Sequence, residues 1–77
     1  MSPKLPRVTA AELLRALNRD GWQEARRSGS HVHLKHDKKT GRVTVAAGHL
    51  GMTLKPKTLA TILAQAGLTV EELRDLL

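Results

Sequence analysis

The stretch Gly29-Ser30-His31-Val32-His33-Leu34-Lys35-His36 is the part of the sequence that best predicts both fold and function. It holds three of the four histidines of the chain. Apolar and polar residues alternate through its centre, and successive side chains of a β-strand point to opposite faces. We therefore expect a half-buried strand whose two apolar side chains face a core. The solvent face of that strand carries two imidazoles and one ammonium group, from His31, His33 and Lys35.

The sequence on either side of this stretch predicts two more strands. Residues 22–28 begin with the only aromatic residue, Trp22, and form the first strand. The second strand covers residues 30–37 and leads into a polar segment, 37–41, whose glycine suits a hairpin loop. Residues 42–46 are rich in β-branched side chains and alternate in polarity, which indicates a third strand.

Helices are predicted on both sides of the three strands. Thr9 and Glu12 have the spacing of a capping box, which places a helix at about residues 10–20. Pro56 suits the first turn of a second helix, because apolar residues at helical spacing follow it. Another capping box predicts a short helix at about residues 70–76. This order is typical of an α+β domain with its helices on one face of an antiparallel sheet.

Composition limits the class of protein. The chain has 77 residues and no cysteine. We therefore expect one small domain at residues 9–77 after a flexible basic leader, residues 1–8. No apolar run could cross a bilayer and the N-terminal segment lacks a secretory signal, so we expect a cytoplasmic protein without a membrane partner. The formal net charge of +6 favours a polyanionic partner, either nucleic acid or an acidic protein.

The histidines also allow simpler interpretations. Polar residues on the exposed face of a strand are usually just solvated, which is the default interpretation for His33 and His36. His31 differs because it begins a strand beside a turn, where functional groups are often placed. A metal site built from His31, His33 and His49 has suitable residue types but an incomplete ligand set, so we expect no metal.

Several short motifs, in order and with compatible spacing, resemble those of the HicA family of toxin ribonucleases. They cover the chain from about residue 10 to residue 68. The motifs are Leu17-x3-Gly21-Trp22, Arg27-x-Gly29-Ser30-His31, Val43-Thr44-Val45 with His49, and Leu54-Lys55-Pro56-x-Thr58-Leu59-x2-Ile62-Leu63-x-Gln65-Ala66-Gly67-Leu68. The Gly-Ser-His element is the most diagnostic of them, and the resemblance implies that its histidine, His31, is catalytic.

The resemblance also implies a fold similar to that of double-stranded-RNA-binding domains, which agrees with the predicted order of elements. It implies a toxin that cleaves mRNA and is inhibited by an antitoxin of the HicB type. Such an antitoxin covers the histidine face, and DNA is contacted only indirectly, through the antitoxin.

Together these observations predict an endoribonuclease that cleaves mRNA with neither a metal ion nor another cofactor. His31 acts as general base or general acid, with His33 as the candidate for the second proton transfer. Lys35 and Arg27 stabilise negative charge on the phosphate. The predicted substrate-binding residues are Gly29, Ser30, Arg27, Lys35 and His33. Two alternatives remain open: a non-catalytic RNA-binding module that uses the same basic face, and an adaptor for an acidic protein.

Overall fold

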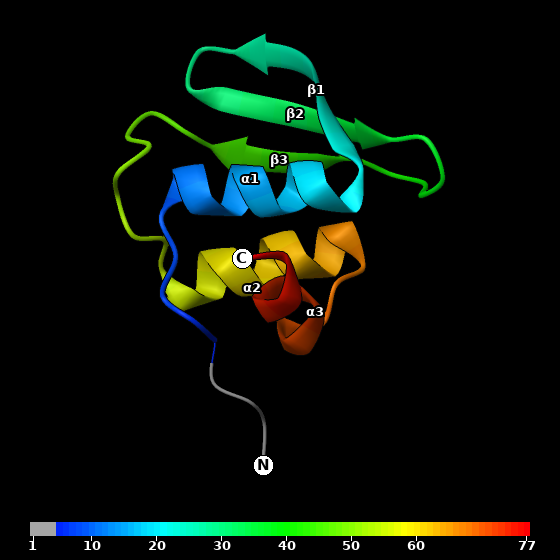
Figure 1. The fold of residues 1–77 in the computed structure, drawn as a ribbon. Helices are drawn as coiled ribbons and strands as arrows, with labels where there is room; N and C mark the ends of the chain where they lie inside the picture. Colours follow the sequence, from blue (N-terminus) through cyan, green and yellow to red (C-terminus); the bar gives the residue numbers. More distant parts are fainter. Residues whose placement is uncertain (1–4) are drawn as a thin grey trace.

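A computed structural model describes residues 5–77 of the chain. The three strands form one antiparallel sheet, and the helices lie on one side of it (Figure 1). The elements follow one another as α1 (Ala10–Asp20), β1 (Trp22–Ser28), β2 (His31–His36), β3 (Val43–Ala46), α2 (Pro56–Ala66) and α3 (Val70–Leu76). This is the predicted α-β-β-β-α order with a short C-terminal helix added. The double-stranded-RNA-binding-domain-like fold class is therefore confirmed.

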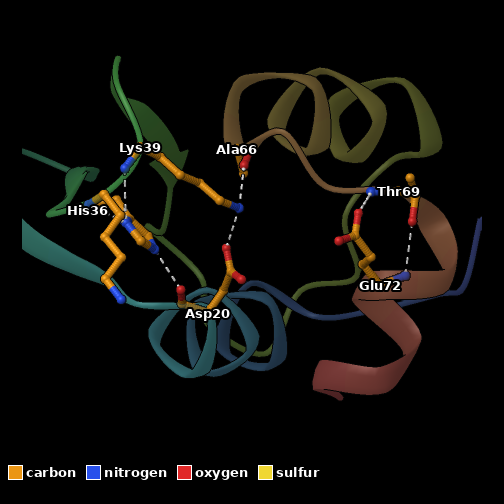
Figure 2. A network of polar contacts seen from close by, with 7 residues as sticks. Asp20, His36, Lys39, Ala66, Thr69 and Glu72 are labelled. Carbon is orange, nitrogen blue, oxygen red and sulfur yellow. Dashed lines mark hydrogen bonds and ion pairs between the residues drawn. The ribbon is translucent and has the colours of Figure 1, made fainter.

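Both predicted capping boxes are present and begin their helices. At α1 the Glu12 amide donates to the Thr9 hydroxyl over 3.1 Å, and the Thr9 amide donates to the Glu12 carboxylate over 2.9 Å. Thr69 and Glu72 form the same pair of bonds at α3, as Figure 2 shows. Each pair satisfies amide groups that the first turn of a helix leaves without a partner. The bounds predicted for these two helices are confirmed.

A glycine ends α1 and turns the chain into the sheet. Gly21 has a φ of 106°, in the left-handed region where a residue with a Cβ is strained. A Cβ at this position would also lie 2.6 Å from Nε2 of His36. Both the backbone conformation and the available space therefore require glycine at this position. Trp22 begins β1 directly after it.

The central strand is β2, which pairs with β1 on one side and with β3 on the other. The observed bounds of β2 and β3 differ from the predicted ones by no more than one residue at each end. The first strand keeps its predicted bounds but contains a bulge, because the pairing with β2 skips from Glu24 to Arg26. Ala25 is the extra residue. A bulge of this kind reverses which side chains face each side of the sheet beyond it.

One apolar core lies between the sheet and the helices. Trp22 is 0% exposed and is the largest side chain in it. The strands contribute Val32, Leu34, Val43 and Val45, and α1 and α2 contribute Leu13, Ala16, Leu17, Leu59, Ile62, Leu63 and Ala66. The apolar faces predicted for these elements are therefore confirmed. Over residues 5–77, no helix is both long enough and apolar enough to cross a membrane.

His36 lies on the helix side of the sheet, and its half-buried ring meets Trp22 edge-on with the ring centroids 5.3 Å apart. Because a carbonyl oxygen can only accept, Nε2 of His36 donates its proton to the Asp20 carbonyl over 2.6 Å. The Nδ1 atom accepts the amides of Lys38 and Lys39, at 2.9 Å and 3.2 Å. The default interpretation of His36 as a solvated side chain is therefore wrong.

Lys39 makes a second connection at this end of the molecule. Its ammonium group lies 2.7 Å from the Asp20 carboxylate and 3.1 Å from the carbonyl oxygen of Ala66, between the last residues of α1 and α2 (Figure 2). A cation at the C-terminal end of a helix is favourable because the free carbonyls carry partial negative charge. Lys39 thus holds both helix ends to the loop between β2 and β3.

The predicted leader, residues 1–8, lies half outside the described residues. In the part that the structure describes, Leu5 packs against the core and Val8 is buried. The Val8 carbonyl accepts the amide of Leu54 over 2.8 Å. Residues just before α1 are thereby joined to the loop that precedes α2.

Candidate nucleic-acid interface

The face of the sheet that is turned away from the helices carries three of the side chains predicted to be functional. Along β2, Val32 and Leu34 are 1% and 2% exposed, because they point into the core. His31 and Lys35 are exposed on the opposite face, and His33 is half-buried there. The predicted phase of this strand is confirmed. We call these three residues, His31, His33 and Lys35, the basic row.

His31 is the first residue of β2 and lies at one end of the sheet. Its partners across the strands are Ser28 in β1 and Ala46 in β3. Within residues 5–77, no hydrogen bond or ion pair engages its imidazole. Both ring nitrogens can therefore be used by a ligand that approaches the exposed face.

The turn before His31 is supported by the loop that follows β3. The Ser30 carbonyl accepts the amide of Ala47 over 2.6 Å. A Cβ at Gly48 would lie 3.3 Å from the Cβ of Ser30, so the two segments are in close contact. Gly29 and Ser30 are both exposed. The predicted substrate-binding turn therefore lies next to His31 and is held in place by backbone contacts.

The ring of His33 is oriented by the neighbouring strand. Its Nδ1 atom lies 3.1 Å from the hydroxyl of Thr44 in β3. The Thr44 amide in turn donates to the side-chain carbonyl of Gln65 in α2 over 3.3 Å. Because Nδ1 is used in this way, Nε2 is the nitrogen of His33 that remains for a ligand. The interpretation of His33 as simply solvated is incomplete, since this ring is half-buried and bonded.

The bulge in β1 decides which arginine lies beside the basic row. In a regular strand, alternation from the buried first residue would place Arg27 on the open face and Arg26 on the helix side. Beyond the bulge the order is reversed, so Arg26 is opposite His33 and Arg27 is opposite the buried Val32. Arg27 forms an ion pair of 2.8 Å with Glu24. The structure thus brings Arg26, and not Arg27, next to the predicted site.

A hollow of about 210 Å³ lies beside His33 on the same face. Three of its side chains are permanently cationic and none is acidic, so it is a region of positive potential. We call it the basic hollow, and it is lined by Ala25, Arg26, His33, Leu34, Lys35 and Arg42.

Two residues of the basic hollow, Arg26 and Arg42, are absent from the predicted site. Arg42 could have been found, because it precedes the inward-facing Val43 and therefore shares the outward face of Thr44. Arg26 could not have been found by the same reasoning, because the position of a bulge is not visible in the alternation of β1.

His49 is the third residue of the metal site that was considered from the sequence. His49 is exposed in the loop after β3. Within the described range, 5–77, no group of three or more His, Cys, Asp or Glu side chains is placed to hold a metal ion.

Comparison with protein families decides the class of protein. The family model described as the HicA toxin of bacterial toxin–antitoxin systems matches residues 10–68, from the first residue of α1 to the residue after Gly67. The chain belongs to the HicA toxin family. No curated protein matches it.

Membership of the HicA family makes this chain the toxin of a toxin–antitoxin system, in which an antitoxin is its partner. The matched residues include the whole sheet, its loops, α1 and α2. They therefore contain every residue of the basic row and of the basic hollow. Of the helices and strands within residues 5–77, only α3 lies beyond the match, and its buried Leu73 packs in the core.

Proposed function

We propose that this HicA toxin is an endoribonuclease that cleaves mRNA without a metal ion, with His31 as an acid–base group. The observation that carries the proposal is the exposed imidazole of His31, which stands without an internal partner in residues 5–77 on the open, basic face. Imidazole gains and loses a proton near neutral pH. An RNA strand on this face would meet an imidazole and several cations together.

The proposed reaction is an attack of the ribose 2′-oxygen on the adjacent phosphorus. As this bond forms, the bond between phosphorus and the 5′-oxygen of the next nucleotide breaks. His31 either takes the proton from the 2′-hydroxyl or gives a proton to the leaving 5′-oxygen. The other transfer needs a second group, and His33 is the candidate because it lies on the same face two residues away.

Cations on the open face stabilise the negative charge that develops on the phosphate oxygens. Lys35 belongs to the basic row and serves this role in the proposal. Arg27, the other cation expected from the sequence, is paired with Glu24 and lies opposite the buried Val32, so it is not part of this proposal. Ser30 and Gly29 form the exposed turn beside His31 and contact the RNA segment that is being cleaved.

The proposed partner of the toxin is an antitoxin of the HicB type. A protein that covers the open face would exclude RNA from His31 and so neutralise the toxin. Because the chain has a formal net charge of +6, we expect the covering surface to be acidic. In this proposal the toxin contacts DNA only indirectly, through the antitoxin.

The test is incubation of the purified chain with end-labelled single-stranded RNA in excess EDTA. Shorter labelled products support the proposal. RNA that stays intact but is bound in a salt-dependent manner would identify a non-catalytic RNA-binding module instead. RNA that is neither cut nor bound would favour the adaptor for an acidic protein, and cleavage that EDTA abolishes would indicate a metal site.

A further inference from the structure

We propose that the basic hollow binds one phosphate of the RNA backbone, next to the phosphodiester that lies at His31. The inference rests on the proposed ribonuclease function, and it assigns a binding role to Arg26 and Arg42. The phosphate bound in the hollow is a neighbour of the cleaved phosphodiester and is not itself cleaved.

Every charged side chain that lines the basic hollow is basic. Within residues 5–77, Arg27 is paired with Glu24 and Lys39 with Asp20. The three cations of the hollow, Arg26, Lys35 and Arg42, form none of these pairs. Cations that gather without a counter-charge repel one another, and a bound anion removes that repulsion. The hollow is therefore suited to an anionic ligand.

The side chains that line the hollow suit a phosphate group. Guanidinium groups donate two parallel hydrogen bonds, a geometry that matches the oxygens of a phosphate. The lining contains no Phe, Tyr or Trp side chain, and Trp22, the one such residue of the chain, is 0% exposed. A base therefore finds none of the large aromatic rings that single-stranded nucleic-acid binders commonly use for stacking. The hollow fits the backbone of a nucleic acid better than its bases.

The hollow lies next to the proposed reaction centre along β2. His31 and His33 lie two residues apart on the same face of β2, which separates their Cα atoms by about 6.6 Å. This spacing is close to that of successive phosphates along an extended RNA strand. A phosphodiester at His31 would thus place a neighbouring phosphate at the hollow, where Thr44 keeps the ring of His33 in position.

The test measures RNA binding separately from cleavage. In the His31→Ala background, which leaves RNA intact if the proposed function holds, the affinity for a labelled single-stranded RNA is measured over a series of salt concentrations. We expect Arg26→Gln and Arg42→Gln each to weaken binding about tenfold. Each change should also reduce the slope of log Kd against log salt by about 0.7, the value for one lost contact to a single strand.

Two variants serve as comparisons in this experiment. Arg27→Gln removes the same charge one residue away on β1, where the side chain is paired with Glu24, and should have the smaller effect. Lys57→Gln removes a charge from an exposed position of α2, away from the open face, and should leave affinity nearly unchanged. Equal losses of RNA affinity in all four variants would mean that RNA is attracted by the overall charge of the protein. This result would overturn the proposal that the basic hollow binds a phosphate.

A second measurement uses substrates of defined phosphate number. The wild-type kcat/KM is compared between a dinucleotide with one phosphodiester and the same dinucleotide carrying a terminal phosphate at its 5′ or 3′ end. One of the two terminal phosphates should raise kcat/KM about tenfold, and Arg26→Gln or Arg42→Gln should remove that gain. If the wild type cleaves RNA and both variants keep the gain in kcat/KM, the proposed role of the hollow is wrong and the ribonuclease proposal stays intact. If the wild type cuts no RNA, the ribonuclease proposal fails, and the binding measurement alone decides on the hollow.

Discussion

Nδ1 of His33 on β2 lies 3.1 Å from the hydroxyl of Thr44 on β3, so one strand of the sheet orients an imidazole of the next. The contact fixes the ring on the open face and leaves Nε2 directed away from Thr44. A side chain placed in this way can act on RNA without first losing rotational freedom.

Thr44→Val tests this orientation. Valine keeps the branched shape of threonine but has no hydroxyl, so the strand is preserved while the bond to His33 is lost. We expect kcat/KM for RNA cleavage to fall about fivefold, which corresponds to one ordinary hydrogen bond of about 1 kcal/mol. Urea unfolding measures what the same lost bond costs in stability, which we expect to be no more than about 1 kcal/mol. An unchanged kcat/KM in a folded Thr44→Val protein would show that the contact does not matter for function.

His36 is expected to contribute to stability and not to activity. Its ring donates to Asp20, accepts two backbone amides and packs on the edge of Trp22. His36→Phe keeps the ring contact but loses the hydrogen bonds, so we expect the free energy of unfolding to drop by about 1–2 kcal/mol. His36→Ala also loses the aromatic contact and should cost about 1 kcal/mol more. Urea denaturation measures both values; a loss below about 0.5 kcal/mol for either variant contradicts the network in Figure 2.

Two glycines with positive φ form a matched pair for a stability test. At Gly67, with a φ of 67°, an added Cβ meets nothing within 4 Å, so Gly67→Ala carries only a conformational cost of about 1 kcal/mol. At Gly21 the same change also brings the Cβ to 2.6 Å from Nε2 of His36. We therefore expect Gly21→Ala to destabilise the fold by at least about 2 kcal/mol. Equal losses at the two positions would mean that the close approach of His36 is unimportant.

The capping box of α1 predicts a pH dependence of stability. The hydrogen bond from the Thr9 amide holds the pKa of the Glu12 carboxyl below its ordinary value, with further help from the Thr9 hydroxyl and Arg15. A carboxyl with a lowered pKa in the folded state stabilises the fold above its unfolded pKa, and this contribution is lost as the pH falls through the folded value. Glu12→Gln should therefore be less stable than wild type at about pH 7, and the difference should shrink towards about pH 3. Urea unfolding over this range checks the sign, and a difference that grows as the pH falls is the opposite result.

The order and bounds of the elements could be predicted because their signals are local. Thr9 and Glu12 mark a helix start by their spacing alone, and the alternation of residues 31–35 identifies both faces of β2. These features depend on neighbours along the chain. They also placed His31, His33 and Lys35 on one face before any tertiary contact was known.

The parts that could not be predicted depend on contacts between distant residues. The bulge at Ala25 arises from the pairing of β1 with β2, and it alone decides that Arg26 and not Arg27 faces His33. In the same way, the bond between His36 and Asp20 joins residues that the sequence separates by a whole strand. Charge and composition indicate neither arrangement, because both depend on which segments meet.

The most direct test of the account is single-turnover cleavage of one defined RNA, in excess EDTA, by wild type and by His31→Ala. Lys57→Ala, at an exposed position of α2, is the control, and thermal unfolding shows that each variant is folded. Because one acid–base group typically contributes a factor of about 100 or more, we expect His31→Ala to be slower by at least that factor and Lys57→Ala to match wild type. If folded His31→Ala cleaves RNA within about threefold of the wild-type rate, His31 is not the acid–base group and the central claim is wrong.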